Sequence, residues 1–254
     1  MHEPPSFAFF RKLNSEIENA NGEVPPENSG RHQFYRQPRG GYLLKEAFIF
    51  DLDGTLLDSM QVWRGIGSSY LRYKGITEDA RDLQKVFDTQ SLPETADYLN
   101  RVFSLGLPRE QICTEINGMS EEQYLYEVQP KKGVRDFLEK HRDTKMCIAT
   151  ATDRYLVEPA LKRLDMAQYF SFILTSSEVG IGKSNPEIFL QASKKLDTPV
   201  SECAVFEDAL HAIKSAKSAG FYVVGVREQT FAEAAGEIDQ LVDQFVTELG
   251  ETGW

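Results

Sequence analysis

The sequence lacks several features that mark whole classes of protein. Its 254 residues contain no apolar run near the roughly eighteen that a membrane-spanning helix needs, and no basic-then-apolar signal pattern stands at the N-terminus. Positive charge is also in deficit, because the formal net charge is −11. An acidic chain is a poor partner for a nucleic-acid backbone. We therefore expect an unexported, cytoplasmic protein that binds neither membrane nor nucleic acid.

Cysteine is scarce as well. The three cysteines, Cys113, Cys147 and Cys203, include no CxxC pair and are odd in number, so no disulfide framework can be drawn. Cys147 and Cys203 fall within predicted strands, where a buried structural thiol is the simplest interpretation. This pattern fits a reducing compartment.

Residues 1–40 have the composition of an arm rather than of a folded element. Sequence patterns typical of turns and linkers recur in MHEPP, EVPPENSG and RQPRGG. We expect this N-terminal arm to be a flexible extension, with a docking or oligomerisation arm as the alternative. The sequence does not indicate an oligomeric state.

From Glu46 onward, short apolar runs alternate with helical patterns. The runs are AFIFD (47–51), MCIAT (146–150), FILTS (172–176), CAVFE (203–207) and YVVGV (222–226). They are continuous rather than alternating, which is typical of strands buried on both faces of a parallel sheet. We therefore predict an α/β fold with a doubly wound, mostly parallel, Rossmann-like sheet.

One interval, residues 60–130, contains no convincing strand. Its patterns predict helices over 60–74, 78–88, 93–105, 108–117 and 120–128, with Pro93 and Pro108 at helix starts. Since a single crossover is usually far shorter, we predict an inserted all-helical cap domain over 60–130. The α/β core then comprises residues 41–59 and 131–254. Met60 and Trp63, on the first of these helices, are expected to belong to the core of the cap, with a position facing the substrate as the alternative.

Polar side chains stand at the ends of the predicted strands, where open parallel sheets bind their ligands. In chain order they are Asp51, Asp53, Thr150 with Ala151, Lys183, Glu207 and Asp208. The four carboxylates cannot share a small cleft without a cation, and oxygen ligands favour a hard ion such as Mg²⁺. Thr150 and Lys183 are donors that suit an anion, so the set is typical of phosphoryl transfer.

Position in the chain indicates a role for each aspartate. Asp51 ends its strand, so its carboxylate can attack phosphorus as a nucleophile and give an aspartyl-phosphate. Asp53 suits a general acid for the leaving oxygen and then a base for water. Gly54 allows a tight turn away from the strand. Thr152, beyond Thr150, is expected to shape the following turn.

Four segments together resemble the motifs of the haloacid dehalogenase-like superfamily. They are DLDGT (51–55), CIAT (147–150), Lys183 with NPEIF (185–189), and FED (206–208). The resemblance covers residues 46–227, and the predicted helical insert is similar to the cap of the β-phosphoglucomutase-like subgroup. Three departures remove no reacting group: KSNP (183–186), Phe206 in place of a glycine, and Lys132-Gly133 in place of a Pro-Gly.

The resemblance also implies roles for particular residues. It implies Asp51 as nucleophile, Asp53 as acid/base, and Thr150 and Lys183 as phosphate ligands. Ala151, which follows Thr150, is expected to bind phosphate as well. It further implies a Mg²⁺ site formed by Asp51, the backbone carbonyl of Asp53, Glu207 and Asp208.

The same resemblance separates phosphatase from other activities. Dehalogenases of the superfamily lack the second aspartate, so Asp53 indicates phosphate-ester chemistry. Mutases of the subgroup carry a histidine where this chain has Trp63, and a cap arginine that FDTQSLPE (87–94) lacks. We therefore predict a Mg²⁺-dependent phosphatase of a small phosphorylated metabolite. A sugar-phosphate mutase is the alternative, and a non-catalytic phosphate-binding module is a third.

Overall fold

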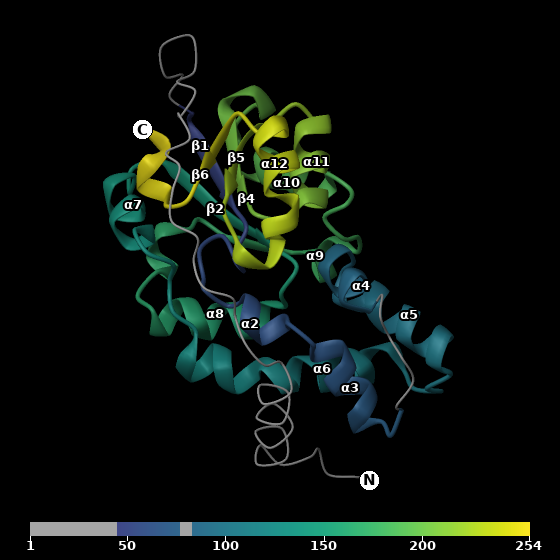
Figure 1. Ribbon diagram of the computed structural model, residues 1–254. Helices are drawn as coiled ribbons and strands as arrows, with labels where there is room; N and C mark the ends of the chain where they lie inside the picture. Colours follow the sequence, from purple (N-terminus) through teal and green to yellow (C-terminus); the bar gives the residue numbers. More distant parts are fainter. Residues whose placement is uncertain (1–44, 77–82) are drawn as a thin grey trace, which may run out of the picture. The chain divides into compact units, whose positions relative to one another are not determined.

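The computed structural model describes residues 45–76 and 83–254 (Figure 1). The arm predicted over residues 1–40 lies outside these residues, as does the first part of the helix predicted over 78–88. None of the described helices is long and apolar enough to cross a lipid bilayer.

A parallel sheet forms the centre of the described chain. Its strands are β1 (Ala47–Phe50), β2 (Lys145–Thr150), β3 (Ile173–Thr175), β4 (Cys203–Glu207), β5 (Tyr222–Val226) and β6 (Gln244–Val246). They lie in the order β3-β2-β1-β4-β5-β6, and every pairing is parallel. The predicted α/β sheet is confirmed, and β6 is an addition to it. Because β1 lies between β2 and β4, the carboxyl ends of these three strands are neighbours.

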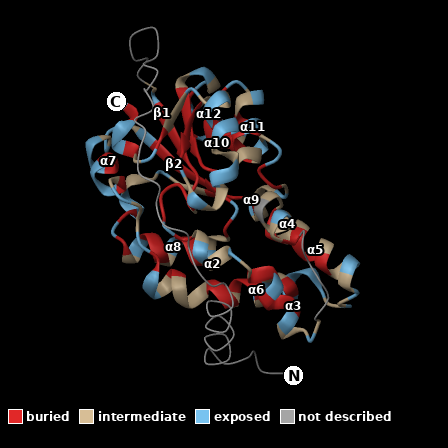
Figure 2. Cartoon of the chain, viewed as in Figure 1, coloured by how far each residue is buried: buried red, intermediate tan, exposed pale blue. Residues whose placement is uncertain are grey.

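Helices cover both faces of the sheet. One face packs against α10 (Glu187–Lys195), α11 (Leu210–Ser218) and α12 (Ala235–Leu241), and the other against α7 (Val134–Lys140) and α8 (Arg154–Arg163). Along β1, Ala47 and Ile49 join the first of these cores, whereas Phe48 and Phe50 join the second. All four are buried, which explains the unbroken apolar runs of the sequence (Figure 2).

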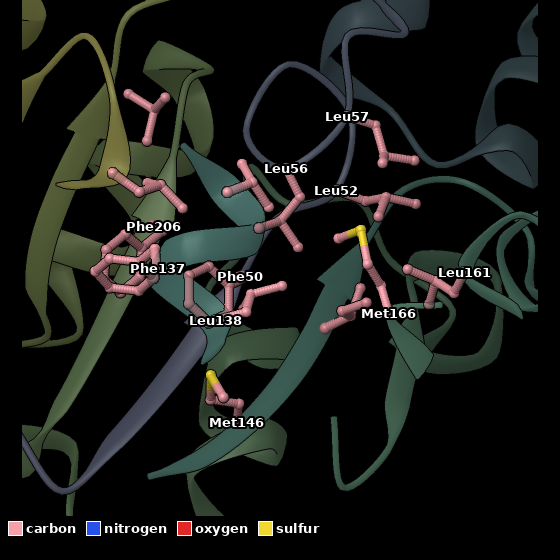
Figure 3. Close-up of a cluster of buried hydrophobic side chains, with 14 of the residues drawn as sticks. Phe50, Leu52, Leu56, Leu57, Phe137, Leu138, Met146, Leu161, Met166 and Phe206 are labelled. Carbon is pink, nitrogen blue, oxygen red and sulfur yellow. The ribbon is translucent and has the colours of Figure 1, made fainter. Parts of the chain in front are cut away.

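Aromatic rings fill the core between the sheet and α7. Phe206 of β4 stacks on Phe50 of β1 with ring centroids 4.5 Å apart, and both contact Phe137 of α7 (Figure 3). Phe206 has no exposed surface. Phe206, a departure from the pattern that the resemblance implies, therefore packs in the core and not among the polar groups that follow it.

Helices also make up the described chain between β1 and α7. They are α2 (Met60–Trp63), α3 (Ile66–Tyr73), α4 (Leu83–Thr89), α5 (Leu92–Phe103), α6 (Arg109–Glu122) and the π-helical turn η1 (Gln123–Glu127). Pro93 lies in the first turn of α5 and Pro108 directly precedes α6, as predicted. In residues 60–76 and 83–127 there is no strand. The division into a cap (60–130) and a core (41–59 and 131–254) stays a proposal.

The remaining elements are short. A four-residue helix, α9 (Ser176–Val179), follows β3 and is closed by Gly180 in a left-handed conformation. The 3₁₀ turns are η2 (Ala167–Tyr169), η3 (Val200–Glu202), η4 (Gln229–Ala234) and η5 (Leu249–Thr252).

Candidate active site

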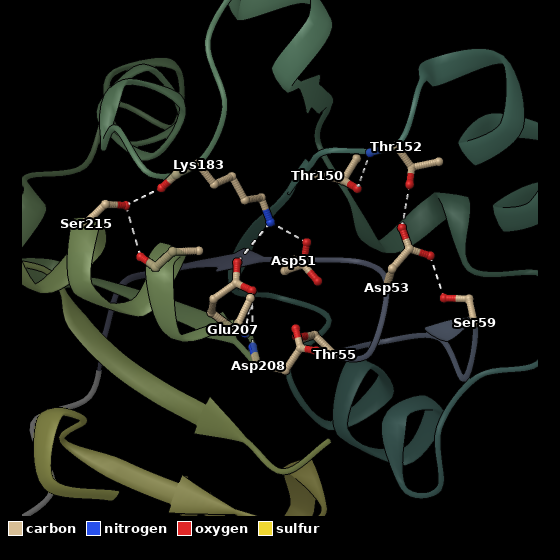
Figure 4. Close-up of polar contacts among 12 residues, drawn as sticks. Asp51, Asp53, Thr55, Ser59, Thr150, Thr152, Lys183, Glu207, Asp208 and Ser215 are labelled. Atoms are coloured by element: carbon tan, nitrogen blue, oxygen red, sulfur yellow. Dashed lines mark hydrogen bonds and ion pairs between the residues drawn. The ribbon is translucent and has the colours of Figure 1, made fainter. Parts of the chain in front are cut away.

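Lys183 joins two carboxylates at the centre of the site (Figure 4). Its Nζ forms ion pairs with Oδ1 of Asp51 and, at 2.9 Å, with Oε2 of Glu207. Asp51 directly follows β1, Glu207 ends β4, and Lys183 lies in the loop between α9 and α10. Ser215 of α11 donates a hydrogen bond to the carbonyl of Lys183 at 2.6 Å and so anchors that loop. Since each of the three charged residues is at most 5% exposed, the charges are stabilised by one another rather than by water.

Asp208 adds a third carboxylate to this cluster. One oxygen from each of Asp51, Glu207 and Asp208 lies within 4.8 Å of the other two. Oδ1 of Asp208 accepts a hydrogen bond from Thr55 at 3.1 Å, whereas its buried Oδ2 has no partner among the described residues. A Cβ on Gly54 would lie 2.2 Å from that Oδ2, and the φ of Gly54 is +85°. Glycine is therefore required for the chain to turn this close to Asp208.

Asp53 is held apart from this cluster by hydroxyl groups. Its Oδ2 accepts from Thr152 at 2.6 Å, and its Oδ1 accepts from both Ser59 and Tyr124. Tyr124 lies in η1, is fully buried, and in turn accepts a hydrogen bond from the indole of Trp63 at 2.8 Å. π-Helical turns are rare and are frequent at functional sites. These contacts fix the direction in which the Asp53 carboxylate points.

Burial and mutual repulsion dominate the ionisation of the cluster. Burial and the nearby Glu207 raise the pKa of Asp51 to about 8. The pKa of Asp208 is raised well above its usual range by burial and by the same neighbouring carboxylates. Burial alone lowers the pKa of Lys183, but attraction to Asp51 and Glu207 outweighs it and the net shift is upward. One lysine thus cannot balance three ionised carboxylates, and a divalent cation would supply the positive charge that lets all three ionise.

A cavity of about 110 Å³ lies over these groups. Its lining includes every residue that the sequence predicts for the site: Asp51, Asp53, Thr150, Ala151, Lys183, Glu207 and Asp208. The hydroxyl of Thr150 accepts a hydrogen bond from the backbone N–H of Thr152 at 3.1 Å. Burial lowers the pKa of His211, which also lines the cavity, to about 4, so this imidazole is neutral at pH 7. The structure therefore brings the predicted residues to one place.

The helices after β1 close the cavity from the other side. The carboxylate of Glu94, in α5, accepts a hydrogen bond at 2.9 Å from the N–H of Gly182, which directly precedes Lys183. On α6, Asn117 donates to Asp153 at 2.5 Å. Both contacts join a helix to a loop at the carboxyl edge of the sheet. In this structure these contacts hold the helical wall of the cavity beside the loop that carries Lys183.

Comparison with known proteins places the chain in a family. Residues 45–220 match the haloacid dehalogenase-like hydrolases. The chain belongs to this family. A phosphorylated carbohydrates phosphatase of Thermotoga maritima is 33% identical over 69% of this chain and 82% of its own. The β-phosphoglucomutase of Bacillus subtilis is 26% identical over 71% of this chain and 83% of its own.

A solved structure agrees with this assignment. A hydrolase from Pseudomonas syringae, 25% identical, superposes with a TM-score of 0.66 over 80% of this chain and 94% of its own. The predicted resemblance is confirmed, and with it the prediction that the chain is an enzyme of the haloacid dehalogenase-like phosphatase family.

Some residues of the site were not found from the sequence. Thr152 was expected only to shape a turn, yet its hydroxyl contacts Asp53. For Met60 and Trp63 the core of the cap was preferred to a position facing the substrate, and both line the cavity. Tyr124 was not singled out at all. Its only signal was an aromatic residue near the end of the helical interval, which is too common a feature to single out one tyrosine.

Proposed function

We propose that this member of the family is a Mg²⁺-dependent phosphatase that hydrolyses a small phosphorylated metabolite through an aspartyl-phosphate on Asp51. The observation that carries the proposal is the position of Lys183, between Asp51 and Glu207 and within one cavity with Asp208. Nucleophile, cation and anion donor then meet at a single point, which phosphoryl transfer requires.

The residues present fit a magnesium ion. The cluster offers only carboxylate oxygens, the donors that hard cations prefer, and Oδ2 of Asp208 is buried without a partner among the described residues. Asp51, Asp208 and Glu207 would hold the ion together with the backbone carbonyl of Asp53. When bound, Mg²⁺ supplies positive charge that offsets the crowded carboxylates and polarises the phosphoryl oxygens.

The side chains then divide the reaction into two steps. A carboxylate oxygen of Asp51 attacks phosphorus, the bond from phosphorus to the ester oxygen breaks, and Asp53 gives its proton to that oxygen. Asp53 next takes a proton from water as the water oxygen attacks phosphorus, which frees phosphate and restores Asp51. Lys183 and Thr150 bind the phosphoryl oxygens through both steps.

The cavity and the relatives support a small substrate. The cavity volume of about 110 Å³ is below the ~300–1,000 Å³ of pockets for drug-sized ligands. The relative that is 33% identical is named as a phosphatase of phosphorylated carbohydrates. By analogy, we propose that the substrate of this chain is a phosphorylated sugar or polyol.

Replacement of the nucleophile tests the proposal. Asp51→Asn is expected to lower phosphate release from a panel of phosphorylated metabolites by at least roughly a thousandfold, because the amide cannot form the acyl phosphate. The control Asp143→Asn makes the same chemical change at an exposed position, and wild-type rates are expected. Wild-type rates in Asp51→Asn, with circular dichroism unchanged, would exclude the aspartyl-phosphate mechanism.

The likeness to β-phosphoglucomutase supports a mutase as the alternative function. Product analysis on the same panel distinguishes the two activities. Free phosphate identifies a phosphatase, whereas a sugar phosphate with a shifted phosphoryl group identifies a mutase. A folded protein that binds Mg²⁺ but turns over no ester would leave the non-catalytic phosphate-binding module.

A further inference from the structure

Three side chains that line the cavity carry polar atoms without a hydrogen-bond partner among the described residues. They are Gln90, which precedes α5, Thr95 in α5 and Asn117 in α6. The Oε1, Oγ1 and Oδ1 atoms of these residues are buried and have no hydrogen-bond partner within residues 45–76 and 83–254. Thr95 has no exposed surface and Asn117 has 2%. Buried polar atoms are nearly always paired, so three unpaired ones around a single cavity call for an explanation.

The identity of these atoms restricts what can pair with them. The carbonyl oxygens of Gln90 and Asn117 only accept hydrogen bonds. The amide nitrogen of Asn117 already donates to Asp153 at 2.5 Å, and this contact assigns which end of the amide is the oxygen. A partner must therefore donate. Hydroxyl groups donate, whereas ionised phosphate and carboxylate groups offer no proton to donate.

The charge of the residues that line the cavity also argues against a second anionic group on the substrate. Lys183 is the only lysine or arginine among the described residues that line the cavity, and Asp51 and Glu207 already pair with it. A second anionic group on the substrate would meet Asp153 and a largely apolar wall. That wall consists of Met60, Trp63, Phe87, Leu92 and Phe231. Burial of an unpaired charge against such a wall is strongly unfavourable.

We propose that Gln90, Thr95 and Asn117 form a subsite for the hydroxyl groups of an uncharged leaving group. The substrate is then a monophosphate ester of a sugar or polyol that carries no second phosphate and no carboxylate. In this proposal the three side-chain oxygens accept hydrogen bonds from substrate hydroxyls, while the apolar wall contacts the C–H face of the carbon chain. This inference rests on the proposed phosphatase activity and narrows its substrate class.

A short series of contacts connects the subsite to the end of the site that binds phosphate. Glu94 lies next to Thr95 and accepts the hydrogen bond from Gly182, the neighbour of Lys183. The same glutamate caps the first turn of α5 through Ser91. The distance from Thr95 to Lys183 is thus set by a short chain of contacts, as selection of a leaving group by its hydroxyl positions requires.

The test compares matched substrates and one near-isosteric variant. Sugar and polyol monophosphates are assayed beside the corresponding bisphosphates, phosphorylated aldonic acids, and phenyl phosphate, which is neutral in its leaving group but has no hydroxyl. We expect the best sugar or polyol monophosphate to exceed its charged counterparts in kcat/KM by at least roughly tenfold. Thr95→Val is expected to lower that kcat/KM roughly threefold to tenfold and to change phenyl phosphate hydrolysis by less than about twofold.

The control is Thr114→Val, the same change at an exposed position on α6, for which wild-type kinetics are expected on both substrates. Removal of an unpaired buried hydroxyl leaves the melting temperature of Thr95→Val at or above that of the wild type, which separates subsite loss from misfolding. A preference for bisphosphates or aldonic acid phosphates, or an equal loss on both substrates in Thr95→Val, overturns the subsite but leaves the phosphatase standing. Failure of the wild type to hydrolyse any ester, phenyl phosphate included, overturns the phosphatase itself.

Discussion

Tyr124 donates a hydrogen bond to the carboxylate of Asp53 across 71 residues of sequence. The tyrosine is buried in the π-helical turn η1 and is itself oriented by the indole of Trp63. The carboxylate that we propose as acid and base is therefore positioned by the helical interval after β1 as well as by the loop that carries it. Burial and the adjacent Asp53 raise the pKa of Tyr124 well above its usual range, so the phenol stays protonated and remains a donor.

Removal of this donor is expected to affect turnover more than binding. In Tyr124→Phe the ring still fills its buried position, but among the described residues Asp53 keeps only the hydroxyls of Ser59 and Thr152 as side-chain donors. We expect kcat to fall between about tenfold and a hundredfold, with KM changed by less than about threefold, because a misplaced acid/base group slows proton transfer.

The matched control is Tyr126→Phe. Tyr126 lies in the same turn and is 70% exposed, so loss of its hydroxyl is expected to leave both constants unchanged. A Tyr124→Phe enzyme with wild-type kcat would show that Tyr124 does not position Asp53.

Lys183 is expected to contribute to both stability and catalysis. Lys183→Met leaves Asp51 and Glu207 buried without their cation, which should lower the free energy of unfolding in metal-free buffer by about 3–5 kcal/mol. Phosphate release should fall by roughly two to three powers of ten, as for loss of an oxyanion donor. Urea unfolding and initial rates measure the two effects. The exposed Lys194→Met should change the free energy of unfolding by less than about 0.5 kcal/mol, and an equally small effect in Lys183→Met would contradict a buried ion pair.

Gly54 is expected to tolerate no side chain. Gly54→Ala places a methyl group 2.2 Å from Oδ2 of Asp208 and strains a backbone with φ +85°. The expected loss is about 1–3 kcal/mol in the free energy of unfolding, together with weaker Mg²⁺ binding. Gly236→Ala is the control, because this exposed glycine lies within α12 with no atom near its Cβ position and should gain roughly 0.5–1 kcal/mol. Equal stability of the two variants would argue against the close approach to Asp208.

The sequence predicted the sheet well because its strands are buried on both faces. Five apolar runs match β1 to β5, whereas β6 has only the three residues Gln244–Val246 and no pattern to mark it. The helix predicted over 60–74 is two helices, because Gly65 adopts a left-handed conformation with φ 73° between α2 and α3. Local periodicity extends across such a break, and only the backbone conformation shows it.

The residues of the site likewise fall into those that the sequence predicts and those that it does not. Residues that stand at strand ends, such as Asp51 and Glu207, were predictable, because the carboxyl ends of parallel strands converge. Tyr124 and Gln90 were not, because they reach the cavity through the packing of helices whose relative positions no local pattern encodes. Their contribution depends on which side chains face one another, and that follows only from the tertiary structure.

Binding of Mg²⁺ at equilibrium tests the central claim, that Asp51, Glu207 and Asp208 converge on one divalent cation. Isothermal titration of MgCl₂ into chelator-treated wild-type protein should show one ion bound per chain. Asp208→Asn should weaken that binding by at least roughly tenfold, about 1.4 kcal/mol, while Asp143→Asn keeps the wild-type affinity. Equal affinities in Asp208→Asn and the wild type, or no binding to the folded wild-type protein, would contradict the account.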